Sequence, residues 1–207
     1  DMQNPRMPKE VGRWWLPGTR MGDEVAAPAR VKPFDSGFRL HTLLVPSERP
    51  DRAYVGWIDG GVIVLDISDK TKPKEVSRIS WQSLNQGFIH TALPILERGL
   101  LVASQESTKD ECADWPMRIS VVDIKNEARP FPLSMLPIPD NFEALCKVGG
   151  RFGAHNINQN NMPQVSQVLK NTVVTAQFGG GLRIYSIENP HQPKEIAYFA
   201  PKVTGNK

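Results

Sequence analysis

The segment GGVIVLDISDKTKPKEVSRISW, residues 60–81, returns in altered form as GGLRIYSIENPHQPKEIAYFAP at residues 180–201. Both copies start with two glycines and an apolar run, pass through a polar turn, and reach Pro-Lys-Glu before a second run. Runs rich in Val, Ile and aromatic residues, bounded by Gly, Pro, Asn and Asp, are typical of short strands. The repeated element is therefore a pair of strands, and a repeat of this kind decides the fold class.

Two weaker copies extend the pattern. MRISVVDIKNEARPFPLSMLPIP occupies residues 117–139, and NPRMPKEVGRWWLPG at residues 4–18 keeps only the last part of the unit. The prolines shared by the copies are spaced 65, 57 and 63 residues apart, at Pro8, Pro73, Pro130 and Pro193. Because two further strand-like runs belong to each full copy, the repeat predicts units of four strands.

These units predict an all-β protein with the architecture of a β-propeller, in which four-stranded sheets, or blades, stand around a central axis. The expected blades are 38–81, 86–139 and 152–201, and residues 1–16 are expected to be the outer strand of a preceding blade. Three blades and one strand do not close a ring. We therefore expect residues 1–207 to be part of one propeller domain of about seven blades, completed by the rest of the protein or by partner chains.

The sequences GGVIVLDISDKTKPKEV and GGLRIYSIENPHQPKEI resemble the LVIVD-repeat proteins, whose repeats read roughly as Gly-Gly, a strand, Asp-Ile-Ser and two later prolines. The resemblance covers the later strands of each unit, which is roughly half of the chain. It implies a β-propeller fold. The family is functionally diverse and its motif concerns packing and turns, so the resemblance implies no particular activity.

The composition narrows the class of protein. An apolar fraction of 40% and a charged fraction of 23% in 207 residues fit a globular chain with a substantial core. No run of about 18 apolar residues is present, so no membrane-spanning helix is expected. The net charge of +3 is small and the cations are mixed with acidic residues, so nucleic acid is not expected as a partner.

Three of the four histidines occupy the same position of the repeat. His41, His90 and His155 each stand at the start of the first strand of a unit. Because first strands line the central channel of a propeller, these residues should meet at one end of it. Imidazole is a common ligand of Fe, Mn, Cu and Zn, so we expect one of these transition metal ions at the axis. The fourth, His191, lies in a proline-rich turn and is expected to face solvent.

A structural role is the alternative for the three histidines, because each is followed by Thr or Asn and can serve as a repeat residue that bonds to a neighbouring unit. Two acidic residues, Asp59 and Glu106, end the second strands of adjacent units on the face of the histidines. Either carboxylate can complete a metal shell, orient a histidine or act as a general base. An acid before Gly-Gly, as at Asp59, is also a common turn former.

The only two cysteines, Cys112 and Cys146, lie in loops that are expected to emerge side by side on this same face. A disulfide between them and a pair of ordinary thiols are both compatible with the sequence. A disulfide favours a periplasmic or secreted location over the cytoplasm, and the compartment is otherwise left open. The spacing of the two cysteines does not indicate a structural zinc site.

Basic and aromatic residues accumulate in the long loops over the histidines, where binding residues are commonly found: Arg20, Arg30, Lys32, Phe34, Trp115, Phe142, Arg151 and Phe152. They favour a small substrate that is aromatic or carboxylated. Together these features predict a metal-dependent enzyme of the oxidoreductase, oxygenase or lyase type. The alternative is a non-catalytic propeller that binds a protein or a glycan through this face.

Overall fold

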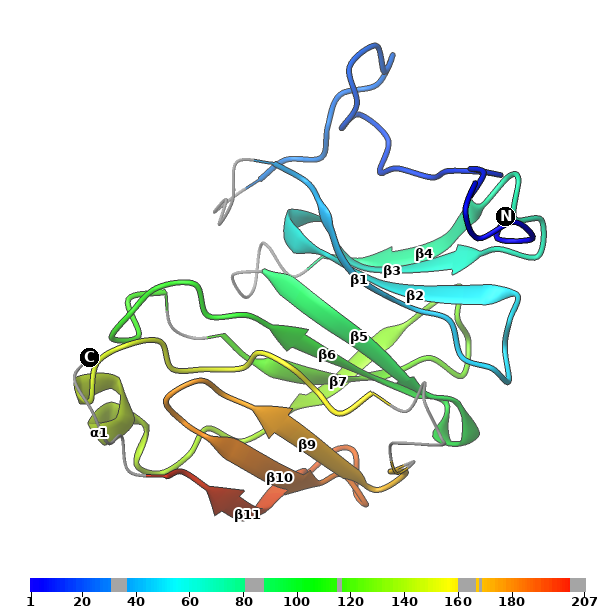
Figure 1. Ribbon diagram of the computed structural model, residues 1–207. Coiled ribbons are helices and arrows are strands. Elements are labelled where there is room, and N and C mark those ends of the chain that lie inside the picture. Colours follow the sequence, from blue (N-terminus) through cyan, green and yellow to red (C-terminus); the bar gives the residue numbers. More distant parts are fainter. Residues whose placement is uncertain (31–36, 81–87, 115–116, 160–166, 168, 202–207) are drawn as a thin grey trace.

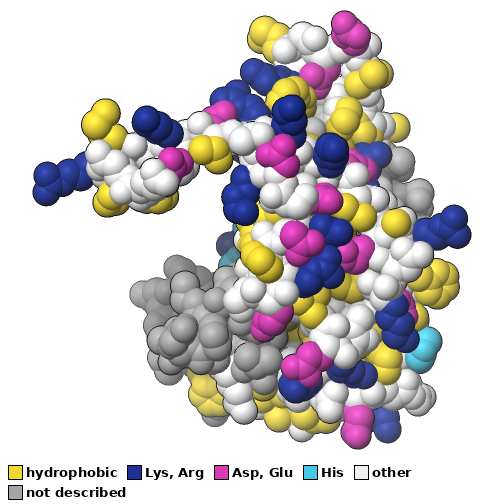
Figure 2. Space-filling view, turned by 90° about the vertical axis from the view of Figure 1, so that its right-hand side faces the viewer, with side chains coloured by type: hydrophobic (Ala, Val, Ile, Leu, Met, Phe, Trp, Pro, Cys, Tyr) yellow, Lys and Arg dark blue, Asp and Glu magenta, His cyan; other side chains and the backbone are white. Residues whose placement is uncertain are grey.

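The computed structural model describes residues 1–30, 37–80, 88–114, 117–159, 167 and 169–201. Its strands form three antiparallel sheets, and the described chain is all-β apart from short helical segments (Figure 1). Within the described residues no helix is both long and apolar enough to cross a membrane. On the face shown in Figure 2, basic and acidic side chains are interspersed, in keeping with the small net charge of +3.

Sheets I and II each contain four strands that follow one another in sequence order. Sheet I consists of β1 (Leu40–Leu44), β2 (Arg52–Trp57), β3 (Gly61–Asp66) and β4 (Lys74–Ile79). Sheet II consists of β5 (Ile89–Ile95), β6 (Leu100–Gln105), β7 (Ile119–Asp123) and β8 (Phe131–Met135). These strands lie within the expected units 38–81 and 86–139, whose limits at 81 and 86 fall outside the described residues.

Sheet III has three strands, β9 (Thr172–Ala176), β10 (Leu182–Ser186) and β11 (Lys194–Phe199), in the order β11-β10-β9. A unit of four strands requires a first strand before β9, but no regular ladder forms there: residues 152–159 of the described chain pair only through the isolated bridges Phe152–Phe178 and Ile157–Thr175. Gly153, whose φ is +133°, interrupts the extended backbone between these bridges. The segment still runs beside β9, where a first strand would lie.

Short helical segments occur in three of the connections: η1 (Ile58–Gly60), η2 (Leu96–Arg98) and α1 (Phe142–Lys147). The repeat did not predict α1. Residues 1–16, expected as an outer strand, form no strand in the described structure, and Pro5 and Pro8 lack the N–H groups that a ladder needs. Trp14, Trp15 and Leu16 instead pack on the outer face of sheet I. That a further blade precedes them stays a prediction.

Successive sheets pack face to face, with one apolar layer between sheets I and II and another between sheets II and III. The layer between sheets I and II includes Tyr54, Val62, Val64, Ile89, Ala92, Leu101, Ala103 and Val122. The layer between sheets II and III includes Leu93, Leu100, Val102, Ile119, Val121, Ile157, Val173 and Tyr185. Burial of these layers fixes each sheet against the next, so equivalent positions of successive units come close together.

The same structural constraint requires glycine at the second glycine position of the repeat in both copies. Gly61 has a φ of +95°, and a Cβ there would lie 1.9 Å from the carbonyl oxygen of Ile79 in β4. Gly181 has a φ of +73°, and a Cβ there would lie 2.3 Å from the carbonyl oxygen of Phe199 in β11. The Gly-Gly motif therefore encodes a close approach of the third strand of a unit to the fourth.

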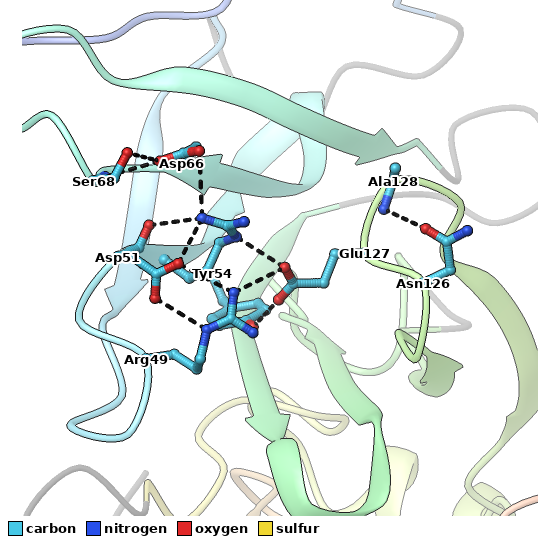
Figure 3. A network of polar contacts seen from close by, with 9 residues as sticks. Arg49, Asp51, Tyr54, Asp66, Ser68, Asn126, Glu127 and Ala128 are labelled. Carbon is cyan, nitrogen blue, oxygen red and sulfur yellow. Dashed lines mark hydrogen bonds and ion pairs between the residues drawn. The ribbon is translucent and has the colours of Figure 1, made fainter.

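A polar network joins sheets I and II beyond the end of β1, at the opposite end of that strand from His41 (Figure 3). Glu127, in the loop between β7 and β8, accepts hydrogen bonds from the hydroxyl of Tyr54 and from Nε of Arg52, the latter over 2.9 Å. Burial, together with the bond to Glu127, raises the pKa of the Tyr54 phenol, which therefore remains a donor. The network ties a loop of sheet II to two residues of β2.

Candidate functional site

Three histidine side chains, one from each unit of the repeat, lie in one row. His41 belongs to β1, His90 to β5, and His155 to the segment that runs beside β9. The ring centroids of His41 and His90 are 4.1 Å apart, and those of His90 and His155 are 4.7 Å apart. Equivalent positions in the sequence repeat are thus neighbours in space.

The carboxylate of Glu106, the residue directly after β6, faces all three imidazoles. Its Oε2 lies 3.8 Å from Nε2 of His41 and 3.9 Å from Nε2 of His90, and its Oε1 lies 3.7 Å from Nε2 of His155. These distances exceed the length of a hydrogen bond. The imidazoles therefore surround the carboxylate without bonding to it directly.

The other nitrogen of each imidazole lies beside the side chain of the next residue. The distances from Nδ1 are 3.2 Å to Oγ1 of Thr42, 2.6 Å to Oγ1 of Thr91 and 3.3 Å to Nδ2 of Asn156. The Thr or Asn after each histidine in the sequence thus contacts Nδ1 and orients the ring. In each case Nε2 is the nitrogen that is turned toward Glu106.

Burial lowers the pKa of both His90 and His155 and so favours their neutral forms. It lowers the pKa of His90 from its ordinary value of 6.5 to about 3, and the nearby His41 and His155 lower it further. Burial also lowers the pKa of His155, with the Glu106 carboxylate acting in the opposite direction and Arg151 and His41 adding to the decrease. A neutral imidazole carries a lone pair on one ring nitrogen, which is the form that binds a metal ion.

Aromatic rings and one guanidinium border the histidine row. Phe88 meets His41 edge-on with centroids 5.5 Å apart, and Phe178 stacks on His155 at 4.4 Å. The guanidinium of Arg151 lies 4.0 Å above the Phe178 ring and donates from Nη1 to Oε1 of Glu106 over 3.1 Å. His41 and His155 are 32% and 28% exposed, against 6% for His90, so solvent reaches the row from the outer two rings.

His41, His90 and Glu106 have the geometry of a possible metal centre. One potential ligand atom from each lies within 4.8 Å of the other two. Donor atoms that share an ion at about 2.1 Å are at most about 4.2 Å apart. Two of the three donor pairs meet this limit, with Nε2–Oε2 distances of 3.8 and 3.9 Å. His155 is outside this group of three and faces the other oxygen of the carboxylate, 3.7 Å away.

Asp59, the second acid singled out from the sequence, is not brought into this group of ligand atoms. It is buried in η1, and its carboxylate accepts hydrogen bonds from Arg30, one of them from Nε over 2.7 Å. The ion pair compensates the burial of the Asp59 carboxylate, while the Arg30 side chain is 22% exposed. Arg30 was expected in a loop that binds substrate, but its guanidinium instead pairs with Asp59.

Cys112 and Cys146 are joined by a disulfide, with their Cα atoms 5.5 Å apart. Of the basic and aromatic loop residues, Arg151 reaches the histidine row, whereas Arg20 stacks on Trp15 and Phe152 is buried. Lys32, Phe34 and Trp115 lie outside the described residues. His191 is exposed, away from the other three histidines in the turn between β10 and β11.

Two residues of the site have roles that the sequence analysis did not predict. Arg151 is a basic residue in a loop, and nothing in its local sequence identifies Glu106 as its partner. For Phe178, by contrast, the repeat does indicate a position at the site. Strand register makes Gln177 the equivalent of Gln105, so Phe178 follows the second strand of its unit as Glu106 does. That position faces the histidine row in both units.

Comparisons with known proteins bear on the repeat. The model of the LVIVD repeat matches residues 51–80, which contain β2, β3 and β4. No curated protein matches the chain. A solved structure, "The crystal structure of a functionally unknown protein from Desulfotomaculum acetoxidans DSM 771", is similar at 10% sequence identity and a TM-score of 0.35. The alignment covers 79% of this chain and 56% of that chain. A likeness this weak supports no conclusion. The chain thus carries an LVIVD repeat, as its sequence predicted.

Proposed function

We propose that His41, His90 and Glu106 hold one transition metal ion, and that the protein is a metal-dependent enzyme. The observation that carries the proposal is the convergence of three imidazole Nε2 atoms on one carboxylate, at 3.7 to 3.9 Å, in a partly buried site. The low pKa of about 3 at His90 removes competition from protons at neutral pH.

The donor set favours iron among the candidate ions. Two histidines and one carboxylate are typical of mononuclear non-haem Fe(II) centres, while Mn, Cu and Zn accept the same nitrogen and oxygen ligands. When bound, such an ion supplies redox or Lewis-acid chemistry at its open coordination positions. We therefore propose an oxidoreductase of the oxygenase or oxidase type.

The surroundings of the histidine row favour a small aromatic or carboxylated substrate. Such a molecule would enter beside His41 and His155, whose side chains are 32% and 28% exposed. The side chain of Arg151 is 39% exposed, and its guanidinium provides a cation for a carboxylate. His155 is the group best placed to move a proton, because its Nε2 faces Oε1 of Glu106 and remains accessible.

The three sheets are proposed to be blades of a β-propeller. Successive sheets pack face to face, and the histidines at the start of the first strands meet at one site. Val62 and Ile119, at equivalent positions of sheets I and II, are 2% and 3% exposed because the next sheet covers them, whereas their equivalent Leu182 in sheet III is 42% exposed. A further blade, from the same protein or from a partner chain, would cover that face.

Metal content of the purified protein, measured by inductively coupled plasma mass spectrometry, tests the proposal. We expect about one ion per chain, lost in His41→Ala, His90→Ala and Glu106→Ala and retained in part in His155→Ala. His191→Ala is the matched control, since that histidine is exposed and distant in the sequence from the site. No metal in the parent after incubation with Fe(II), Mn(II), Cu(II) or Zn(II) would contradict the proposal and favour a non-catalytic scaffold that binds a protein or a glycan.

A further inference from the structure

We infer that the Cys112–Cys146 disulfide positions Arg151 on Glu106, so that a thiol reductant loosens the metal site. The inference rests on the proposed function for its effect on metal binding. Cys112 lies in the loop that begins at Glu106 and Ser107, and Cys146 lies in α1, five positions before Arg151. The bridge therefore joins the loop of the acid to the loop of its guanidinium partner.

The contacts around the bridge lead directly to Arg151. The N–H of Glu111 donates to the carbonyl of Gly150 over 2.9 Å, and Asp110 and Arg151 form an isolated β-bridge. Arg151 then donates from Nη1 to Oε1 of Glu106 over 3.1 Å and to the carbonyl of Ser107 over 3.4 Å. The disulfide holds the two loops at the spacing that these bonds require.

The two loops depend on the disulfide to different degrees. On the side of Cys112, the buried carboxylate of Asp114 accepts hydrogen bonds from Ser107 Oγ over 2.9 Å and from the Lys109 N–H over 3.1 Å, among others. On the side of Cys146, none of the six residues of α1, all of them described, is buried. A helix that buries so little is held mainly by its tether. Reduction should therefore release α1 and loosen the residues up to Arg151, whose carbonyl still accepts the Gly179 N–H over 3.0 Å, while Ser107–Asp114 keep their own bonds.

The bridge is chemically accessible, because Cys112 and Cys146 are both partly exposed. A thiolate attacks one sulfur, forms a mixed disulfide with it and expels the other cysteine as a thiolate, which takes up a proton. A second thiol of the reductant then resolves the mixed disulfide. The protein gains two electrons and two protons overall, and a dithiol reductant is converted into its disulfide. No other co-reactant is needed.

Arg151 is thus a positioning residue for Glu106. Its hydrogen bond to Oε1 fixes the carboxylate with Oε2 on the side of His41 and His90. Loss of a hydrogen-bonding partner of a metal ligand typically lowers metal affinity about 10- to 100-fold. The opposing effect is electrostatic, since removal of a cation beside the site favours a bound metal ion. Positioning predicts weaker binding, and electrostatics alone predicts tighter binding.

Hydrogen exchange of the metal-free protein tests the structural half of the inference. Reduction by a dithiol, or the double substitution Cys112→Ser with Cys146→Ser, should accelerate amide exchange in residues 141–151 and leave β5 and β6 unchanged. The double variant should not respond further to the dithiol. Unchanged exchange in residues 141–151 after complete reduction, verified by thiol titration, would overturn the inference whether or not the protein binds metal.

Titration with Co²⁺, followed by its visible absorption bands, tests the functional half. The reduced protein, the double Ser variant and Arg151→Met should each bind Co²⁺ about 10- to 100-fold more weakly than the oxidised parent. Arg151→Lys should recover part of the loss, and Arg151→Met should leave the exchange of residues 141–147 unchanged. Equal or tighter binding in Arg151→Met would exclude a positioning role. No Co²⁺ binding to the oxidised parent would instead refute the proposed metal site.

Discussion

Arg151 occupies one oxygen of the Glu106 carboxylate, donating from Nη1 to Oε1 over 3.1 Å, and leaves Oε2 to face His41 and His90. A carboxylate with one oxygen bound to a guanidinium keeps the lone pairs of the other for a cation. One acid can therefore serve both a positioning residue and a metal ion. Asp59 cannot replace it there, because its own carboxylate is buried against Arg30.

Asp59→Ala should lower the free energy of unfolding without loss of bound metal. The substitution leaves the partly exposed Arg30 guanidinium without its carboxylate, and the loss of hydrogen bonds between charged groups costs about 2 kcal/mol. Urea denaturation measures the loss. Glu143→Ala, an exposed substitution in α1, is the control and should change stability by less than about 0.5 kcal/mol. Loss of metal with unchanged stability would return Asp59 to the metal site.

The metal-free protein should become less stable as the pH falls, because of His90. In the unfolded chain this imidazole takes up a proton as the pH falls through about 6.5, its ordinary pKa. In the folded protein burial lowers its pKa to about 3, so the folded state binds no proton there until about that pH. The unfolded state is thus favoured progressively between about pH 6.5 and pH 3, and this contribution levels off below.

Urea midpoints of the chelator-treated protein at several pH values between 7.5 and 4.5 measure this dependence. His90→Gln removes the titrating group and should flatten the dependence relative to the parent. His191→Gln, at an exposed position, should leave it unchanged. The same slope in His90→Gln and in the parent would show that the imidazole of His90 is not held neutral by the fold.

Glu127→Ala should weaken the contact between sheets I and II. It removes the acceptor shared by the Tyr54 hydroxyl and the Arg52 guanidinium (Figure 3), and lost hydrogen bonds to a charged group cost about 2 kcal/mol. Tyr54→Phe removes one donor and should cost about 1 kcal/mol. A double-mutant cycle from denaturation curves should give a coupling between the two, and strictly additive effects would contradict the network.

Gly61→Ala should destabilise the protein by about 3 kcal/mol, because a Cβ would meet the Ile79 carbonyl oxygen 1.9 Å away at a φ of +95°. Gly22→Ala separates the two causes. That glycine has a similar φ of +90°, but its Cβ would meet no described atom within 4 Å. Thermal denaturation should therefore show a clearly smaller effect for Gly22→Ala, and equal effects would assign the whole cost to backbone conformation.

The sequence predicted sheets I and II because their strands keep a regular pattern and their turns use glycine, proline and aspartate in a physical role. Gly61 permits the approach of β4, and the Asp66 carboxylate accepts the N–H of Ser68 over 2.9 Å in the turn after β3. Local rules of this kind can be read from single residues. The segment 153–159 is the exception: its run is strand-like in sequence, but it starts with a glycine at a φ of +133° and bridges β9 only at Ile157.

The candidate site was predictable to the extent that it follows the repeat. Equivalent positions led to His41, His90 and His155, and the ends of second strands led to Glu106. The contact of Arg151 with Glu106 and the pairing of Asp59 with Arg30 depend on how long loops fold back, which no periodicity encodes. Phe178 is recognised as the equivalent of Glu106 only when the register of β9 with β10 is compared with that of β6 with β7.

A crystal structure of the metal-loaded protein, with anomalous diffraction recorded at the absorption edge of the bound metal, tests the central claim most directly. The account predicts one strong anomalous peak about 2.0–2.2 Å from Nε2 of His41, Nε2 of His90 and Oε2 of Glu106, with Arg151 still on Oε1. A peak elsewhere, or a loaded protein in which these three residues do not contact the ion, would contradict it.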